Sequence, residues 1–91
     1  MTIQIGAITF DEAEYDDRGD VLYLNVGEPE PAAQTLETSE GHAVHYDRHG
    51  GVVGLTLLNV RQTLKREGEL TISWPQAHLS PEQLGDALTP A

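Results

Sequence analysis

Cysteine is absent from this chain of 91 residues. Its absence excludes disulfide bonds, thiolate metal sites and cysteine nucleophiles, and it fits a reducing, cytoplasmic location. Basic residues are scarce as well: five lysines and arginines stand against fifteen aspartates and glutamates, so the formal net charge is −10. Such a surface repels DNA and RNA over most of its area, and we expect no nucleic-acid partner.

Long apolar runs are also missing. No stretch approaches the roughly 20 apolar residues that a membrane-spanning helix requires, and the opening MTIQIGAITF lacks the basic start of a signal peptide. The sequence contains no P-loop, no dinucleotide-binding fingerprint and no Gly-x-Ser-x-Gly motif. We therefore expect a cytoplasmic protein with no membrane contact and no cofactor.

Short segments of β-forming residues alternate with turn residues along the chain. The length argues for one domain over residues 1–91. We predict strands at about residues 2–5, 8–15, 21–26, 34–37, 42–47, 52–58 and 69–74, and helices at about 60–67 and 80–88. The expected fold class is α+β, an antiparallel β-sheet built from hairpins with one or two short helices. An acidic connection at 27–41 joins its two halves.

The first predicted hairpin has its own signals. Gly6 and Ala7 suit a two-residue type II′ turn. A change of alternation after Phe10 indicates a bulge near Asp11 and Glu12 within one continuous strand.

The ends of the predicted helices are marked by capping residues. Asn59 can cap the first helix, and Gly68 can end it. Ser80 can cap the C-terminal helix, with Pro81 at its first position and Gln83 at its third.

One short phrase occurs twice, as YDDRGDV and later as YDRHGGV. Each copy contains Asp-x-x-Gly. Aspartate is favoured at the first position of a type I turn, where its carboxylate accepts a backbone N–H, and glycine at the fourth position can take a positive φ. The phrase therefore predicts two related hairpins and not a catalytic pair of acids. The predicted structural turn residues are Asp16, Gly19, Asp47 and Gly50, in hairpins at about 13–26 and 43–58.

The strands of the two hairpins alternate in phase, so that one face of the sheet is expected to form the core. Its predicted members are Leu22, Leu24, Val26, Val53, Leu55 and Leu57. The opposite face also carries apolar groups, namely Val21, Tyr23, Val52 and Leu58. Because short helices cover only one face well, we expect the other to bind a second subunit, most simply as a homodimer.

Two groups of side chains could hold a metal. The carboxylates of the first hairpin suit calcium or magnesium, but their spacing does not match an EF-hand loop. The histidines of the second hairpin suit zinc, but residues three apart in a strand face opposite sides. We therefore expect a solvated acidic hairpin, surface histidines and no metal site. The residues are Asp11, Glu12, Asp16, Asp17 and Asp20, and His42, His45 and His49.

The basic residues cluster on the first predicted helix. Arg61 and Lys65 are four apart on one helical face, and Arg66 is adjacent. They can simply stabilise the C-terminal end of the helix, or they can form a patch for an acidic partner or another subunit. The candidate partner contacts are Tyr23, Arg61, Lys65 and Arg66.

The stretch YDDRGDVLYLNV, followed by an acidic connection and GHAVHYDRHGGVVGLTLLNV, resembles the small bacterial family known as domain of unknown function 2283. The resemblance covers about 15–60. Thr56 departs from it, since similar sequences often carry glutamate there. The family has no established activity, so the resemblance assigns no catalytic, metal or cofactor-binding residue. The matching positions are Tyr15, Asp16, Asp20, Leu22, Tyr23, Tyr46, Asp47, Gly50, Val53 and Gly54.

These observations favour a small acidic bacterial protein that works as a non-catalytic interaction module or self-associates. An acidic, antitoxin-like inhibitor of a basic partner protein is an alternative. A divalent-metal-dependent enzyme that uses the acidic hairpins is a weaker one.

Overall fold

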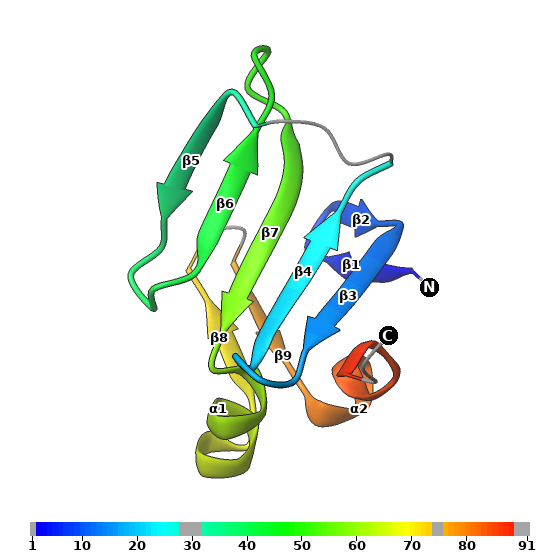
Figure 1. Ribbon diagram of the computed structural model, residues 1–91, viewed down its shortest axis with the longest axis vertical. Helices are drawn as coiled ribbons and strands as arrows, with labels where there is room; N and C mark the ends of the chain where they lie inside the picture. The colour runs from blue at the N-terminus through cyan, green and yellow to red at the C-terminus, as the bar shows by residue number, and fades with distance from the viewer. Residues whose placement is uncertain (1, 28–31, 74–75, 89–91) are drawn as a thin grey trace.

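The computed structural model describes residues 2–27, 32–73 and 76–88, and it has the predicted α+β architecture (Figure 1). The strands are β1 Ile3–Ile5, β2 Ile8–Phe10, β3 Glu12–Asp16, β4 Val21–Asn25, β5 Gln34–Glu37, β6 Ala43–Tyr46, β7 Val52–Leu58, β8 Leu70–Ile72 and β9 Ala77–Leu79. The helices are α1 Val60–Glu67, α2 Pro81–Leu84 and the 3₁₀ turn η1 Gly85–Leu88. None of the described helices is long and apolar enough to cross a membrane.

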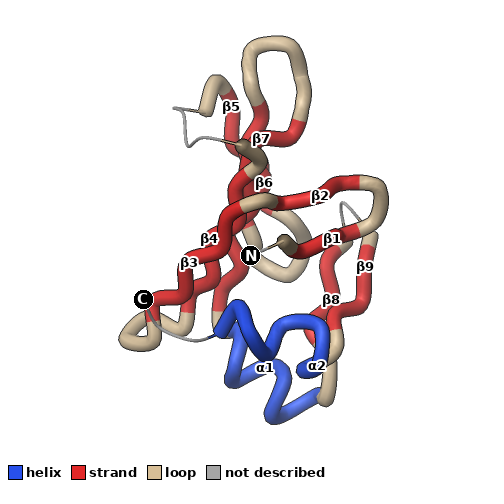
Figure 2. The backbone as a smooth tube through the Cα atoms, turned by 90° about the vertical axis from the view of Figure 1, so that its right-hand side faces the viewer, coloured by secondary structure: helices blue, strands red, loops and turns tan. Residues whose placement is uncertain are grey.

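Five strands form the main sheet in the order β3-β4-β7-β6-β5, and all neighbours are antiparallel. Two small hairpins, β1–β2 and β8–β9, lie on the same side of this sheet (Figure 2). The core fills the space between them. No other described element covers the opposite face, which is turned toward the viewer in Figure 1. We call this uncovered surface the open face.

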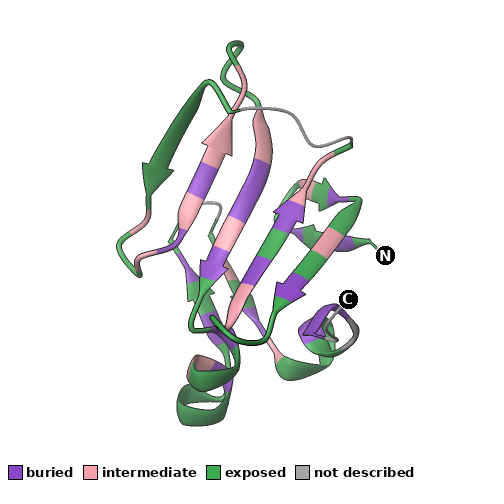
Figure 3. Cartoon of the chain, in the orientation of Figure 1, coloured by how far each residue is buried: buried purple, intermediate pink, exposed green. Residues whose placement is uncertain are grey.

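Most of the predicted core residues join the core. Leu22, Leu24, Leu55 and Leu57 are fully buried (Figure 3), and Val26 packs against them. These side chains alternate as a two-residue period requires. Burial of leucine side chains of this kind stabilises the fold by about 2 kcal/mol each.

The predictions that Val53 faces the core and that Val52 lies on the opposite face are wrong. The register between β6 and β7 shifts between His45 and Tyr46, so that Tyr46 pairs with Val52 and His45 with Gly54. Val52 therefore packs against the core and Val53 does not. A bulge of this kind offsets the alternation by one residue, which a strict period of two does not anticipate.

The prediction of one continuous strand over residues 8–15 is also wrong, because the chain leaves one sheet and enters another at Asp11. The Asp11 N–H donates to the Asn25 carbonyl at 2.9 Å, and the Asp11 carboxylate accepts from the Gly27 N–H at 2.7 Å. Phe10 ends the first hairpin fully buried, while Glu12 starts β3. The first hairpin itself turns at Gly6, whose φ of 61° suits the predicted type II′ turn.

The C-terminal segment differs from its prediction in two ways. The strand predicted at 69–74 is shorter, and β9, which pairs with it, was not predicted. Trp74 and Pro75, which were expected to end that strand, lie outside the described residues. The helix predicted at 80–88 is α-helical only over α2 and continues as η1, and Ser80 and Gln83 form the predicted capping box at its start.

The two Asp-x-x-Gly turns are not equivalent. In the second, Gly50 has a φ of 83°, and the Asp47 carboxylate accepts the N–H groups of His49 at 2.8 Å and Gly51 at 2.9 Å. In the first, the expectation of a positive φ at Gly19 is wrong, because Asp20 takes it instead, with a φ of 56°. Four residues lie between the paired Asp16 and Val21 in the first turn, whereas three lie between Asp47 and Gly51 in the second, where the Asp47 N–H donates to the Gly51 carbonyl at 2.8 Å.

Candidate functional site

Asp20 lies at the junction between the first hairpin and α1. Its Oδ1 accepts the hydroxyl of Tyr15 at 2.6 Å and the N–H of Arg61 at 2.8 Å, and its Oδ2 accepts the N–H of Gln62 at 3.0 Å. The Asp20 carbonyl accepts the N–H of Val60 at 3.2 Å. The first N–H groups of a helix have no partner inside it. Asp20 therefore acts as the cap of a helix that begins 40 residues later in the chain.

The electrostatics of this junction follow from these contacts. Burial of the Asp20 carboxylate works against ionisation, but the hydrogen bonds from Tyr15, Arg61 and Gln62 outweigh it and hold the pKa of Asp20 below its usual value. Burial, together with the hydrogen bond to Asp20, raises the pKa of Tyr15 to about 12. The pair is therefore a carboxylate and a neutral phenol at neutral pH, and neither is poised to exchange a proton.

The prediction that the Asn59 side chain caps α1 is wrong. Asn59 occupies the capping position with a φ of 52°, but its side chain makes no cap hydrogen bond. Asp20 already occupies the place of the capping acceptor. Gly68 ends the helix as predicted, with a φ of 82° and its N–H donated to the Leu64 carbonyl.

The four candidate partner contacts do not form one surface. The Arg61 guanidinium lies 5.0 Å from the centre of the Tyr15 ring and donates to the Leu88 carbonyl at 2.5 Å, so it ties α1 to β3 and η1. Arg66 pairs with the adjacent Glu67 at 2.8 Å, and Lys65 is exposed. Tyr23 lies on the open face, on the other side of the sheet from Tyr15.

Three of the five predicted carboxylates accept backbone N–H groups. Asp11 accepts from Gly27, Asp16 accepts from Arg18 at 3.0 Å, and Asp20 caps α1. Among residues 2–27, 32–73 and 76–88, no three histidine, aspartate or glutamate side chains lie close enough together to hold a metal ion.

His42 is not the surface histidine that was expected, since it is only 3% exposed. Its Nδ1 accepts the N–H of Leu58 at 3.1 Å, and the ring also hydrogen-bonds the Thr71 backbone. Burial lowers the pKa of His42, although Glu40 and Thr71 oppose that shift. The imidazole is therefore neutral and joins β6, β7 and β8.

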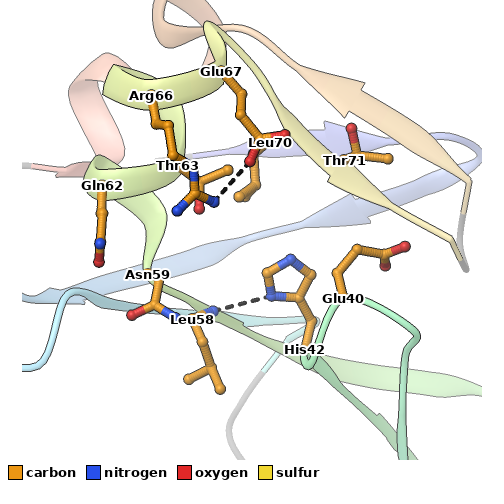
Figure 4. A pocket seen from close by; sticks show the side chains of 10 residues that line it. All are labelled: Glu40, His42, Leu58, Asn59, Gln62, Thr63, Arg66, Glu67, Leu70 and Thr71. Atoms are coloured by element: carbon orange, nitrogen blue, oxygen red, sulfur yellow. Dashed lines mark hydrogen bonds and ion pairs between the residues drawn. The ribbon is translucent and has the colours of Figure 1, made fainter.

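A polar hollow of about 320 Å³ opens beside His42 (Figure 4). Arg66 and Glu67 of α1 both line it and form an ion pair with each other at 2.8 Å, and the Glu40 carboxylate accepts the N–H of Ser73 at 2.9 Å. Hydrogen bonds from Ser73 lower the pKa of Glu40. The Glu40 carboxylate also accepts the Ser73 hydroxyl, whereas the Nδ1 of His42 is already bonded to the Leu58 N–H and is not positioned as a base for that hydroxyl.

A second group of polar side chains lies on the open face. His45 lies across the centre of the sheet, with Nδ1 at 2.9 Å from the Thr35 hydroxyl and Nε2 at 2.8 Å from the Thr56 hydroxyl. Glu14 pairs with Tyr23, which pairs in turn with Thr56. A second hollow of about 340 Å³ lies over these residues. Sequence reasoning identified Tyr23 here but missed the position of His45 at the centre.

The comparisons with known proteins agree with the resemblance seen in the sequence. No curated protein and no solved structure matches the chain. The family model described as "Protein of unknown function (DUF2283)" matches residues 12–61, from the start of β3 to the capped start of α1. The matched segment contains the whole five-stranded sheet and the Tyr15–Asp20–Arg61 junction. The chain therefore belongs to the DUF2283 family.

Proposed function

We propose that this chain is a non-catalytic interaction module whose open face binds a basic segment of a partner protein. One observation carries the proposal: the five strands of the main sheet contain no lysine or arginine, and their outward positions carry four carboxylates. These are Glu12, Glu14 and Asp16 on β3 and Glu37 on β5. Neighbouring charges of one sign favour a partner of the opposite sign.

The centre of the open face supplies an anchor for such a segment. Tyr23 is 41% exposed although it stands in the middle of a sheet. Its direct neighbour on β3 is Glu14. An arginine or lysine side chain can lie along the Tyr23 ring while its charged end meets the Glu14 carboxylate. Exposed aromatic side chains beside charges are typical of residues that dominate binding energy.

The chemistry of the face supports binding more than catalysis. Both ring nitrogens of His45 are already engaged by threonine hydroxyls. The group beside the Nε2 of His45 is the Thr56 hydroxyl and not a carboxylate that could orient the imidazole as a base. An antitoxin-like inhibitor that masks a basic, nucleic-acid-binding partner would be one form of this function.

Site-specific photocrosslinking in the native host tests the proposal. A benzophenone amino acid at position 23 should crosslink one discrete partner, and the same amino acid in place of Gln4, which is exposed on the β1–β2 hairpin, should not. The captured partner is then purified and its binding measured directly. Glu14→Lys should weaken binding by at least about 10-fold, because it replaces attraction by repulsion directly beside Tyr23.

Glu69→Lys is the matched control, because Glu69 is also exposed and its replacement changes the net charge by the same amount. This control should change affinity by less than about threefold, and raising the salt should weaken the wild-type complex. A partner that binds both variants equally, or that lacks a basic surface, would contradict the proposal.

A further inference from the structure

Strand β5 forms one edge of the main sheet, and no strand of the described chain pairs with its outer side. All four of its residues are exposed, and Leu36 is 50% exposed, more than any other large apolar side chain described (Figure 3). The strand QTLE contains neither lysine nor proline. Natural proteins usually protect edge strands with such residues, because a bare edge is a template for another strand.

The hydrogen-bonding pattern shows which backbone groups are unpaired. The Thr38 N–H donates to the His42 carbonyl at 2.7 Å, so this pair is a hydrogen-bonded one. Hydrogen-bonded and non-hydrogen-bonded pairs alternate along antiparallel strands. The N–H and C=O of Leu36 therefore face β6, whereas those of Thr35 and Glu37 point away from the sheet.

We propose that this edge pairs with the β5 edge of a second copy of the chain, in antiparallel register about a two-fold axis through Leu36. Leu36 then lies opposite the second copy's Leu36, and Thr35 lies opposite the second copy's Glu37. Every outward N–H and C=O of Thr35 and Glu37 is paired in this register. The two Leu36 residues form a non-hydrogen-bonded pair, in which side chains approach most closely.

Other symmetric registers satisfy fewer groups. Directly opposite residues share a face, so a two-fold axis through the sheet must place one residue opposite its own copy. An axis through Thr35 would place Glu37 opposite Ala33, whose N–H is already donated to the Tyr46 carbonyl at 2.8 Å. It would also leave Leu36 opposite Gln34. The Leu36 register, in contrast, pairs the free groups of both Thr35 and Glu37 and covers the exposed leucine.

Pairing of this kind joins two five-stranded sheets into one continuous sheet. The contact is small, which predicts a weak dimer with a dissociation constant on the order of 10–100 μM. Each copy carries a net charge of −10. Added salt should therefore strengthen the dimer, in contrast to the binding of a basic partner. The pairing depends on the β5 backbone and on Leu36, which lies opposite buried Val44 and so on the core side of the sheet, and therefore this inference does not depend on the proposed function.

A single cysteine tests the register, because the chain has none of its own. In a non-hydrogen-bonded antiparallel pair the Cα atoms are about 4.5 Å apart, within the range that a disulfide bridges. Leu36→Cys should therefore form a covalent dimer under mild oxidation. Thr35→Cys should not, because it lies opposite Glu37 of the second copy and more than about 7 Å from its own counterpart. Leu36 is exposed, so both variants should fold.

A charge variant tests the wild-type dimer without oxidation. Leu36→Lys should raise the dimer dissociation constant at least about 10-fold in sedimentation equilibrium, because it places two ammonium groups against each other. Leu58→Lys is the matched control, since Leu58 is 38% exposed on the open face, and it should change the constant by less than about threefold. A wild-type protein that stays monomeric up to about 500 μM overturns the proposal. So does a dimer that Leu36→Lys leaves intact, or one that crosslinks equally at Thr35 and Leu36.

Discussion

Replacement of Asp20 should be among the most costly single changes in a partly exposed residue of this protein. Asp20→Ala removes the acceptor of the Arg61 and Gln62 amides and of the Tyr15 hydroxyl. Loss of a helix cap costs about 1 kcal/mol, and a buried hydroxyl that loses a charged acceptor costs about 1–2 kcal/mol. Alanine at a φ of 56° adds about 1 kcal/mol. Water can replace part of the cap, and we expect a total loss of about 3 kcal/mol.

Two further substitutions at the same position separate these contributions. Asp20→Gly removes the side chain but suits a positive φ, so it should cost about 1 kcal/mol less than Asp20→Ala. Asp20→Asn keeps one acceptor oxygen and also tolerates this backbone conformation, so it should cost about 1 kcal/mol. A double-mutant cycle between Asp20→Ala and Tyr15→Phe should give a coupling energy of about 1 kcal/mol, because both changes remove the same hydrogen bond.

Urea denaturation followed by circular dichroism measures these differences. Asp17→Ala is the control, because Asp17 is exposed in the same loop and its loss should change stability by less than about 0.5 kcal/mol. The folded state lowers the pKa of Asp20, so its contribution is present above about pH 4 and is lost as the pH falls further. The Asp20 variants should lose less stability than the wild type in that acid range. If Asp20→Ala were as stable as Asp17→Ala, the assignment of the cap would be refuted.

Three further substitutions test other parts of the structure. The folded state lowers the pKa of His42, so the contribution of this residue to stability is present above about pH 6.5 and declines below it. His42→Asn, which keeps an acceptor, should therefore lose less stability than the wild type between pH 7 and 5 in urea titrations. If the two proteins lost stability with pH at the same rate, this would be contradicted. Gly50→Ala should cost about 1 kcal/mol in thermal unfolding because of its φ of 83°. Gly19→Ala should cost less, because Gly19 has no positive φ and its new Cβ would mainly displace the Asp16 carboxylate, 3.3 Å away. Equal costs would mean that the two turns are equivalent. Gly54→Ala should cost about 1–3 kcal/mol, because the new Cβ would lie 3.2 Å from the Leu24 carbonyl oxygen. A calorimetric unfolding midpoint equal to that of the wild type would show that the sheet relaxes around the methyl group.

The buried leucines show how far local alternation reaches. Leu22 and Leu24 on one strand and Leu55 and Leu57 on another were assigned to one face from their spacing alone, and they lie opposite each other in the core. The spacing works because successive side chains of a strand must point to opposite faces. It fails at Val53, where an extra residue enters β7, since nothing in the local sequence distinguishes a bulge from a regular strand.

The capped start of α1 shows what local reasoning misses. Asn59 is a residue type that favours the N-cap position and it occupies that position, yet the side chain of Asp20 provides the cap. Capping preferences describe a residue and its neighbours in sequence, whereas Asp20 is close to α1 only because β4 pairs with β7. Buried His42 is a similar case, since its burial depends on the packing of β8 against the sheet. Both positions could be noticed in the sequence, but neither role could be assigned.

The sequence by itself determined the α+β class, most of the strands, the core-facing leucines and the acidic character of the surface. These properties depend on composition and on the alternation of neighbouring residues, and both can be read directly from the sequence. Only the tertiary structure decided that Asp11 separates two sheets, that Asp20 caps α1, and that no other described element covers one sheet face or pairs with the β5 edge. Those features depend on whether segments that are distant in the sequence come into contact in the fold. Local sequence patterns do not predict such contacts.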